Sequence, residues 1–214
     1  MPMIYDHRGN EKEYIENTME SFINSYNEGI ETDVRLTLDN KIILHHDDCL
    51  TRIYKYPYFI NKLYYDSIKE KCKSIVVLYD FLTFCFKNNK KIILDVKEKT
   101  YVNICYIIDY CIRFCKINNY DIKNIIFLVW VKILKPRKNI NLFFAFNTNY
   151  IPNEKIVEYK TNYLIDGICL EYIGGIKNRE SLKNIKKNGL LTNVYSSINN
   201  LNLNSINYVD IFTL

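Results

Sequence analysis

The chain has 214 residues, of which 48% are hydrophobic and 25% are charged, and it carries a formal net charge of +5 at pH 7. These values are typical of a globular protein and exclude an intrinsically disordered chain, and the length allows one barrel, one doubly wound sheet or two small domains. The basic charge and the 19 tyrosines do not indicate nucleic-acid binding, because Lys, Asn, Ile and Tyr are enriched along the whole chain rather than in one segment.

The sequence also predicts the redox state of the cysteines and the cellular compartment of the protein. Its seven cysteines are an odd number without a Cys-x-x-Cys pair, which favours reduced, mostly buried thiols over a disulfide framework or a zinc site. The N-terminus lacks the pattern of a signal peptide, and no apolar run approaches the ~18 residues of a membrane span. We therefore expect a soluble, cytoplasmic protein without a transmembrane segment.

Short runs rich in β-branched and aromatic residues alternate with helical segments along the chain. The first helix is expected at residues 17–29, with Asn17 as its N-cap and Glu20 three residues later. A hairpin with Asp39 and Asn40 at its turn follows the second strand. The predicted strands lie at residues 3–7, 30–36, 91–97, 124–131, 142–147, 164–172, 189–195 and 208–214, and further helices at 101–119, 153–160 and 178–189.

This alternation predicts the fold class. Eight strands separated by helices are typical of an α/β protein with a (β/α)8 TIM barrel. We expect residues 1–214 to form one barrel domain, with the last helix missing or truncated because the sequence stops at the eighth strand.

Polar residues gather where the predicted strands end, which is where barrel enzymes place their functional groups. His7 and Arg8 end the first strand, and Glu31 and Asp33 project from one face of the second because they are two residues apart. Two carboxylates that face a barrel interior need a counter-charge, and a divalent cation with oxygen ligands is the usual partner. The alternative is an ion pair between Asp33 and Arg35.

The third strand and the hairpin add further candidates. Asp95 and Lys97 are two residues apart, so they bring a third carboxylate and a cation to the same strand ends, unless they form only an ordinary ion pair. His45 and His46 follow the hairpin, and strand alternation sends them to opposite faces. Only one of these two histidines is therefore expected to face the site.

Together these residues resemble a known family. The segments HRGN, ENTMESF, GIETDV, TLDNKIILHHDDCLTR and ILDVK are similar, in order and spacing, to the glycerophosphodiester phosphodiesterases, densely over residues 7–52 and again at 92–97. The later segments GLLTNVYSSIN and NYVDIFTL resemble the last two strands of that family more weakly. The resemblance implies a metal-dependent (β/α)8 barrel that hydrolyses glycerophosphodiesters to glycerol 3-phosphate and an alcohol.

The resemblance also implies a cofactor, a partner and a set of site residues. The cofactor would be one divalent cation, Mg²⁺ or Ca²⁺, and the partner a small glycerophosphodiester. Asp47 and Arg52 match a pair of structural residues, and Asp95 stands where most members have a glutamate. The implied site residues are the catalytic pair His7 and His46, the phosphate-binding residues Arg8 and Lys97, and the metal ligands Glu31, Asp33 and Asp95.

Two other functions remain open at this point. A sphingomyelinase D-like lipid phosphodiesterase is a related barrel in which aspartate is the usual third metal ligand. The weaker match of the C-terminal half would suit a barrel that has lost turnover and acts as a binding module. The segment 52–66, which is rich in tyrosine and lysine, could form a short lid over a glycerol-sized pocket or contact a membrane surface.

Overall fold

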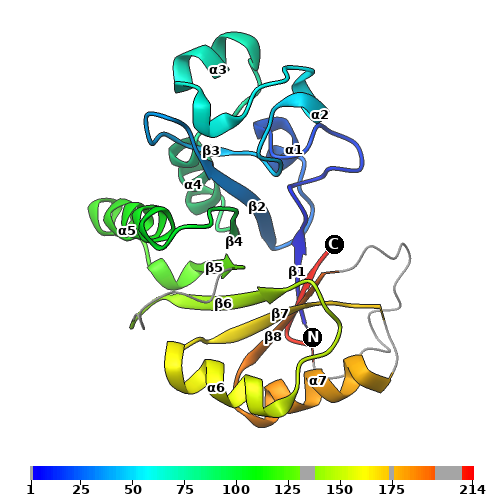
Figure 1. Ribbon diagram of the computed structural model, residues 1–214. Helices are drawn as coiled ribbons and strands as arrows, with labels where there is room; N and C mark the ends of the chain where they lie inside the picture. The colour runs from blue at the N-terminus through cyan, green and yellow to red at the C-terminus, as the bar shows by residue number, and fades with distance from the viewer. Residues whose placement is uncertain (1, 131–137, 174–175, 196–208) are drawn as a thin grey trace.

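The computed structural model describes residues 2–130, 138–173, 176–195 and 209–214, which include a closed barrel of parallel strands (Figure 1). Its strands are β1 (Met3–Asp6), β2 (Gly29–Leu36), β4 (Lys91–Val96), β5 (Ile125–Val129), β6 (Asn141–Phe146), β7 (Gly167–Glu171), β8 (Leu191–Tyr195) and β9 (Ile211–Thr213). They are paired in the order β1-β9-β8-β7-β6-β5-β4-β2, and a β1–β2 pairing closes the circle. The predicted (β/α)8 TIM barrel is confirmed.

Within the described residues, helices connect β1 to β2, β2 to β4, β4 to β5, β6 to β7 and β7 to β8 along the outside of this barrel (Figure 1). The helices α5 and α7 form where the sequence predicts them, and α6 extends somewhat further than predicted. The strands begin and end within three residues of the predicted bounds, while residues 131 and 208 of the predicted strands lie outside the part of the chain that the structure describes. The connecting elements are α1 (Met19–Ile23), α4 (Leu78–Lys87), α5 (Tyr101–Asn118), η2 (Ile122–Asn124), α6 (Asn153–Tyr163) and α7 (Ile176–Lys187).

The first helix, α1, is shorter than predicted and begins differently. It spans Met19–Ile23, and its N-cap is Thr18 rather than Asn17. The Thr18 side chain accepts a hydrogen bond from the Ser21 amide, and the Ser21 hydroxyl accepts one from the Thr18 amide. Ser21 rather than Glu20 therefore completes the capping box.

The predicted hairpin is confirmed, and it leads into a separate packing unit. Strand β3 (Ile42–Leu44) pairs antiparallel with β2, and Asn40 at the turn has φ 58°, a left-handed conformation that asparagine tolerates. After β3 the chain forms α2 (Thr51–Tyr54), η1 (Ile60–Lys62) and α3 (Tyr65–Lys71), which lie together at one end of the molecule (Figure 1). We call residues 45–77 the excursion. Its buried residues Leu50, Ile60, Ile68, Cys72 and Ile75 form one cluster with Ile43 of β3.

The barrel itself has two apolar clusters. The larger one lies between the strands and the surrounding helices, and the smaller one fills the barrel interior. Ile93 belongs to the interior cluster, and Asp95 lies two residues later on the same face of β4. The interior cluster therefore forms an apolar floor beneath the charged residues at the carboxyl ends of the strands. Its members are Tyr5, Ile93, Ile126, Leu128, Phe143, Ala145, Cys169 and Ile211.

All seven cysteines are free, and all but Cys49 are buried, in agreement with the prediction of reduced, mostly buried thiols. Among the described residues, no helix combines the length and the apolar character needed to cross a membrane.

Candidate active site

Three carboxylates meet at the carboxyl end of the barrel interior. Glu31 and Asp33 come from β2, and Asp95 comes from β4, where it is paired in register with Asp33. One oxygen from each carboxylate lies within 4.8 Å of the others, and all three residues are buried. We call these residues the carboxylate trio. The structure thus brings the three predicted metal ligands together.

Two cationic side chains of the chain itself contact the trio. Lys97 Nζ lies 3.1 Å from Asp33 Oδ1 and 2.6 Å from Asp95 Oδ2, and Arg8 Nε lies 3.0 Å from Asp33 Oδ2. Burial raises the pKa of Asp33, but Lys97 and Arg8 outweigh burial and hold this pKa well below its usual range. Asp33 is therefore the carboxylate that stays ionised, between two positive charges.

Neighbouring cations neutralise the negative charges of Glu31 and Asp95 less fully than that of Asp33. Burial, together with the charge of Asp33, raises the pKa of Glu31 to about 8, and burial also raises the pKa of Asp95. Asp33 Oδ1 is buried without a hydrogen bond, although Lys97 Nζ is 3.1 Å away, because that ion pair lacks hydrogen-bond geometry. Three close carboxylates with excess negative charge and one oxygen free of hydrogen bonds fit a hard divalent cation such as Mg²⁺ or Ca²⁺.

His7 lies at the edge of the carboxylate trio. Its Nδ1 is 2.6 Å from Glu11 Oε1, and its Nε2 is 3.9 Å from Glu31 Oε2. Burial lowers the pKa of His7, but the hydrogen bond to Glu11 and the charge of Glu31 outweigh burial and leave the pKa raised. Arg8 and Gly9 then turn the chain with φ 52° and 77°, and the Arg8 amide donates to Glu31 Oε2. Glu11 thus holds one ring nitrogen of His7, and the other nitrogen faces the trio.

The two histidines after the hairpin occupy different environments. His46 has a side chain that is 35% exposed, and its Nδ1 is 2.8 Å from Asp47 Oδ1. His45 is only 3% exposed, and its ring faces Tyr54 at a centroid distance of 5.9 Å. Arg35 donates through Nε and Nη2 to the His46 carbonyl oxygen, rather than pairing with a carboxylate of β2. His46 is thus the more accessible of the two rings, and Arg35 holds its backbone.

Glu16 is a site residue that sequence reasoning missed. Arg52 donates to both of its oxygens, at 2.7 and 2.6 Å, and donates through Nε to Asp47 Oδ2 at 2.6 Å. Arg8 also donates to both Glu16 oxygens at 3.2 Å. Through Arg52, Glu16 therefore connects Arg8 to Asp47. Asp47 in turn contacts His46. The position of Glu16 in the ENTMESF segment, which resembles the family, could have identified it as a site residue. Its contact with Arg52 could not be predicted, because the two residues are distant in sequence.

Two further residues contact the trio and were also missed. Asn17 Nδ2 donates to Asp33 Oδ2 at 2.9 Å, and Asn17 Oδ1 accepts from the Thr32 hydroxyl at 2.6 Å. Trp130 Nε1 donates to Asp95 Oδ1 at 2.7 Å. The position of Trp130 near the carboxyl end of the predicted strand 124–131 was the signal that could have identified it, because barrel enzymes place functional groups at strand ends.

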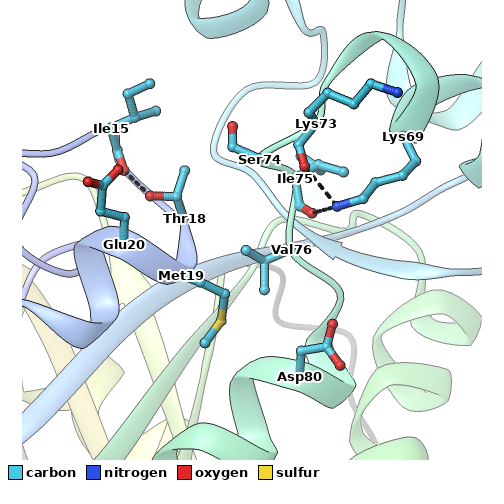
Figure 2. A pocket seen from close by; sticks show the side chains of 10 residues that line it. All are labelled: Ile15, Thr18, Met19, Glu20, Lys69, Lys73, Ser74, Ile75, Val76 and Asp80. Atoms are coloured by element: carbon cyan, nitrogen blue, oxygen red, sulfur yellow. Dashed lines mark hydrogen bonds between the residues drawn. The ribbon is translucent and has the colours of Figure 1, made fainter.

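A pocket on the outside of the barrel lies apart from all of these residues. Figure 2 shows it between α1, the end of α3 and the start of α4, with Glu20, Asp80 and Lys73 at its wall. Lys69 donates to the carbonyl oxygens of Lys73 and Ile75 at 2.8 and 3.0 Å. This lysine therefore holds the chain after α3, and the pocket contains none of the candidate site residues.

Comparison with known proteins identifies the family of this chain. A family model described as "Glycerophosphoryl diester phosphodiesterase family" matches residues 7–208. The uncharacterized protein YqiK of Bacillus subtilis (strain 168) is 39% identical over 72 residues, which are 32% of this chain and 30% of that protein. The matched segment thus spans less than a third of this curated relative.

Solved structures of similar proteins share the fold. A glycerophosphodiester phosphodiesterase from Thermotoga maritima has a TM-score of 0.75 and 23% identity, with 100% of this chain and 94% of that chain covered. A phosphodiesterase from Oleispira antarctica, solved with its product sn-glycerol-3-phosphate, has a TM-score of 0.77 and 16% identity, with 100% and 92% covered.

Proposed function

Because the chain belongs to the glycerophosphoryl diester phosphodiesterase family, we propose that it hydrolyses glycerophosphodiesters to glycerol 3-phosphate and an alcohol. The observation that carries the proposal is the buried carboxylate trio, which lies beside His7 and two cationic side chains at the carboxyl end of the barrel. The Oleispira phosphodiesterase with bound sn-glycerol-3-phosphate supports the same class of product.

The charged residues would divide the binding of cation and substrate between them. Glu31, Asp33 and Asp95 would hold one Mg²⁺ or Ca²⁺, which when bound supplies positive charge to the phosphodiester as negative charge develops on its oxygens. Arg8 and Lys97 contact the trio from two sides and would bind the phosphate oxygens. A negatively charged phosphodiester repels nucleophiles, so this concentration of positive charge favours attack.

His7 and His46 would carry the proton transfers. One of them would accept a proton from the nucleophile, which is water or a hydroxyl group of the substrate, and the other would protonate the leaving alkoxide. Glu11 and Asp47 each contact the Nδ1 atom of one of these histidines. These contacts orient the rings and leave Nε2 of each available for the substrate.

Turnover of glycerophosphocholine, with and without Mg²⁺ or Ca²⁺, tests the proposal. We expect glycerol 3-phosphate to be released with a cation, to be lost in EDTA, and to return when the cation is restored. Asp33→Asn is the matched control for contaminating activity, since it removes a charge from the trio. Cleavage of sphingomyelin instead would favour a sphingomyelinase D-like enzyme, and binding without turnover of any phosphodiester would favour a binding module.

A further inference from the structure

Trp130 is the single tryptophan of the chain, and it lies beside the carboxylate trio. It directly follows β5, which pairs in parallel with β4, the strand that carries Asp95. Its side chain packs against the interior cluster of the barrel. The indole ring is therefore placed between the apolar floor and the charged residues.

Trp130, Asp95 and Lys97 each contact the other two. Trp130 Nε1 donates to Asp95 Oδ1 at 2.7 Å, and Lys97 Nζ donates to Asp95 Oδ2 at 2.6 Å. Lys97 Nζ also lies 5.3 Å from the centroid of the indole ring, within the range of a cation–π contact. Each oxygen of Asp95 thus has its own donor, and these two donors fix the plane of the carboxylate.

The ring is supported from the other side of the barrel. Tyr195 on β8 meets Trp130 in an edge contact with centroids 6.3 Å apart. The Tyr195 hydroxyl donates in turn to Asn147 Oδ1 at 3.2 Å. The edge contact between the two rings, which does not depend on this hydroxyl, therefore supports the indole from a second strand.

The indole N–H is well suited to hold a buried ligand group. It can only donate, so it supports the charged form of Asp95 and does not compete for a cation. Burial raises the pKa of Asp95, whereas the hydrogen bonds from Lys97 and Trp130 act in the opposite direction. Hydrogen-bond partners of metal-binding side chains commonly change metal affinity by about 10- to 100-fold.

We propose that Trp130 is a positioning residue, which holds Asp95 and Lys97 in the orientations that bind the cation and the phosphate. This inference rests on the proposed cation site. Trp130 acts through these two side chains and does not itself touch the reacting atoms.

Calorimetric titration of the metal-free protein with Mg²⁺ and with Ca²⁺ tests the role of the indole N–H. Trp130→Phe keeps an aromatic face for Lys97 but removes the donor to Asp95. We expect its dissociation constant to rise about 10- to 100-fold, with an unchanged circular dichroism spectrum. Tyr195→Phe is the matched control. It also removes one hydrogen-bonding group from an aromatic side chain near the trio, but it leaves Asp95 with its bonds from Lys97 and Trp130. Its dissociation constant should stay close to that of the wild type.

An NMR measurement gives a second readout that needs no cation. With one tryptophan, the ¹H–¹⁵N spectrum contains one indole resonance. In the metal-free protein, Asp95→Asn replaces a carboxylate acceptor by a weaker amide oxygen, so we expect this resonance to move upfield. In the wild type, added Mg²⁺ should move the same resonance with the midpoint found by calorimetry.

The outcomes separate this inference from the proposed function. Equal cation affinity in wild type and Trp130→Phe would overturn the positioning role and leave the cation site intact. An indole resonance that is unchanged in Asp95→Asn would overturn the contact itself. A wild-type protein that binds neither cation would overturn the proposed cation site and this inference together.

Discussion

Each proposed catalytic histidine has one carboxylate at its Nδ1, which is Glu11 for His7 and Asp47 for His46. We expect His7→Ala and His46→Ala each to lower kcat for glycerophosphocholine by about 10²- to 10⁴-fold, because a positioned acid or base contributes that much. His45→Ala should change kcat little. Steady-state kinetics, with circular dichroism to verify folding, measures the difference.

The environment of His45 makes it a useful comparison. His45 is buried against Tyr54, so its replacement should lower the unfolding temperature even where turnover persists. Equal losses of kcat for His45→Ala and His46→Ala would contradict the assignment of His46.

Asn17 combines a left-handed backbone, with φ 56°, and three buried hydrogen bonds to β2. We expect Asn17→Ala to lower the free energy of unfolding by about 2–4 kcal/mol, through the lost hydrogen bonds and the strained backbone. Asn17→Gly removes the same side chain but relieves the backbone, so it should be about 1 kcal/mol less destabilising. Urea unfolding of the metal-free variants measures both values, and an Asn17→Ala protein as stable as the wild type would contradict this account.

The residues that the sequence identified are those whose neighbours follow from local spacing. Glu31 and Asp33 share a face because strand residues alternate, and Asp95 joins them because β4 pairs in register with β2. The contacts of Trp130 with Asp95 and of Glu16 with Arg52 join separate elements. Such contacts depend on how loops and segments that are distant in sequence pack together, which no local pattern encodes.

Among the elements, the excursion has its own apolar cluster, distinct from the two clusters of the barrel. We expect Ile60→Ala to destabilise this unit locally by about 2–5 kcal/mol, because it leaves a cavity in a small buried cluster. Hydrogen exchange measured by mass spectrometry should show faster exchange in residues 45–77 and unchanged protection in the barrel strands.

An exposed aliphatic residue supplies the control for this measurement. Val102 on α5 is 72% exposed, so Val102→Ala should leave exchange unchanged throughout. Faster exchange in the barrel strands of Ile60→Ala would show that the excursion and the barrel unfold as one unit. Because Arg52 on α2 contacts Glu16, loosening the excursion should also lower turnover.

The first helix shows why the start of an element can be mispredicted. Asn17 and Thr18 are both good N-cap residues, and Glu20 and Ser21 both offer a side-chain oxygen in the first turn. The side chain of Asn17 is bound to Asp33 and Thr32, so it is not available to cap α1. A tertiary contact therefore decides between two locally similar starts.

At the scale of the whole molecule, the structure bears on the choice between soluble and membrane-bound substrates. The candidate membrane segment 52–66 buries Ile60, commits Arg52 to Glu16, and contains only short helical turns. It therefore offers no extended amphipathic helix of the kind that enters a lipid surface. We expect glycerophosphoethanolamine to be hydrolysed faster than lysophosphatidylcholine vesicles in parallel assays.

Two exposed aromatic residues of that segment allow the opposite outcome to be recognised. Tyr58 and Phe59 are each about half exposed. A preference for vesicles that disappears when both are replaced by serine would contradict the expected preference and assign the segment to membrane contact.

The circular order of the strands has a consequence for the time course of synthesis. β1 can pair with β2 early, but its other edge pairs with β9, and the amide of His7 donates to the carbonyl oxygen of Leu214. At about 5–20 residues per second, a ribosome needs about 10–40 seconds to make the chain between these two residues. During that interval one edge of β1 has no native partner, and joining such distant segments is slow. His7 receives this backbone partner only after Leu214 has been made, so a nascent chain should become catalytically competent only after that point.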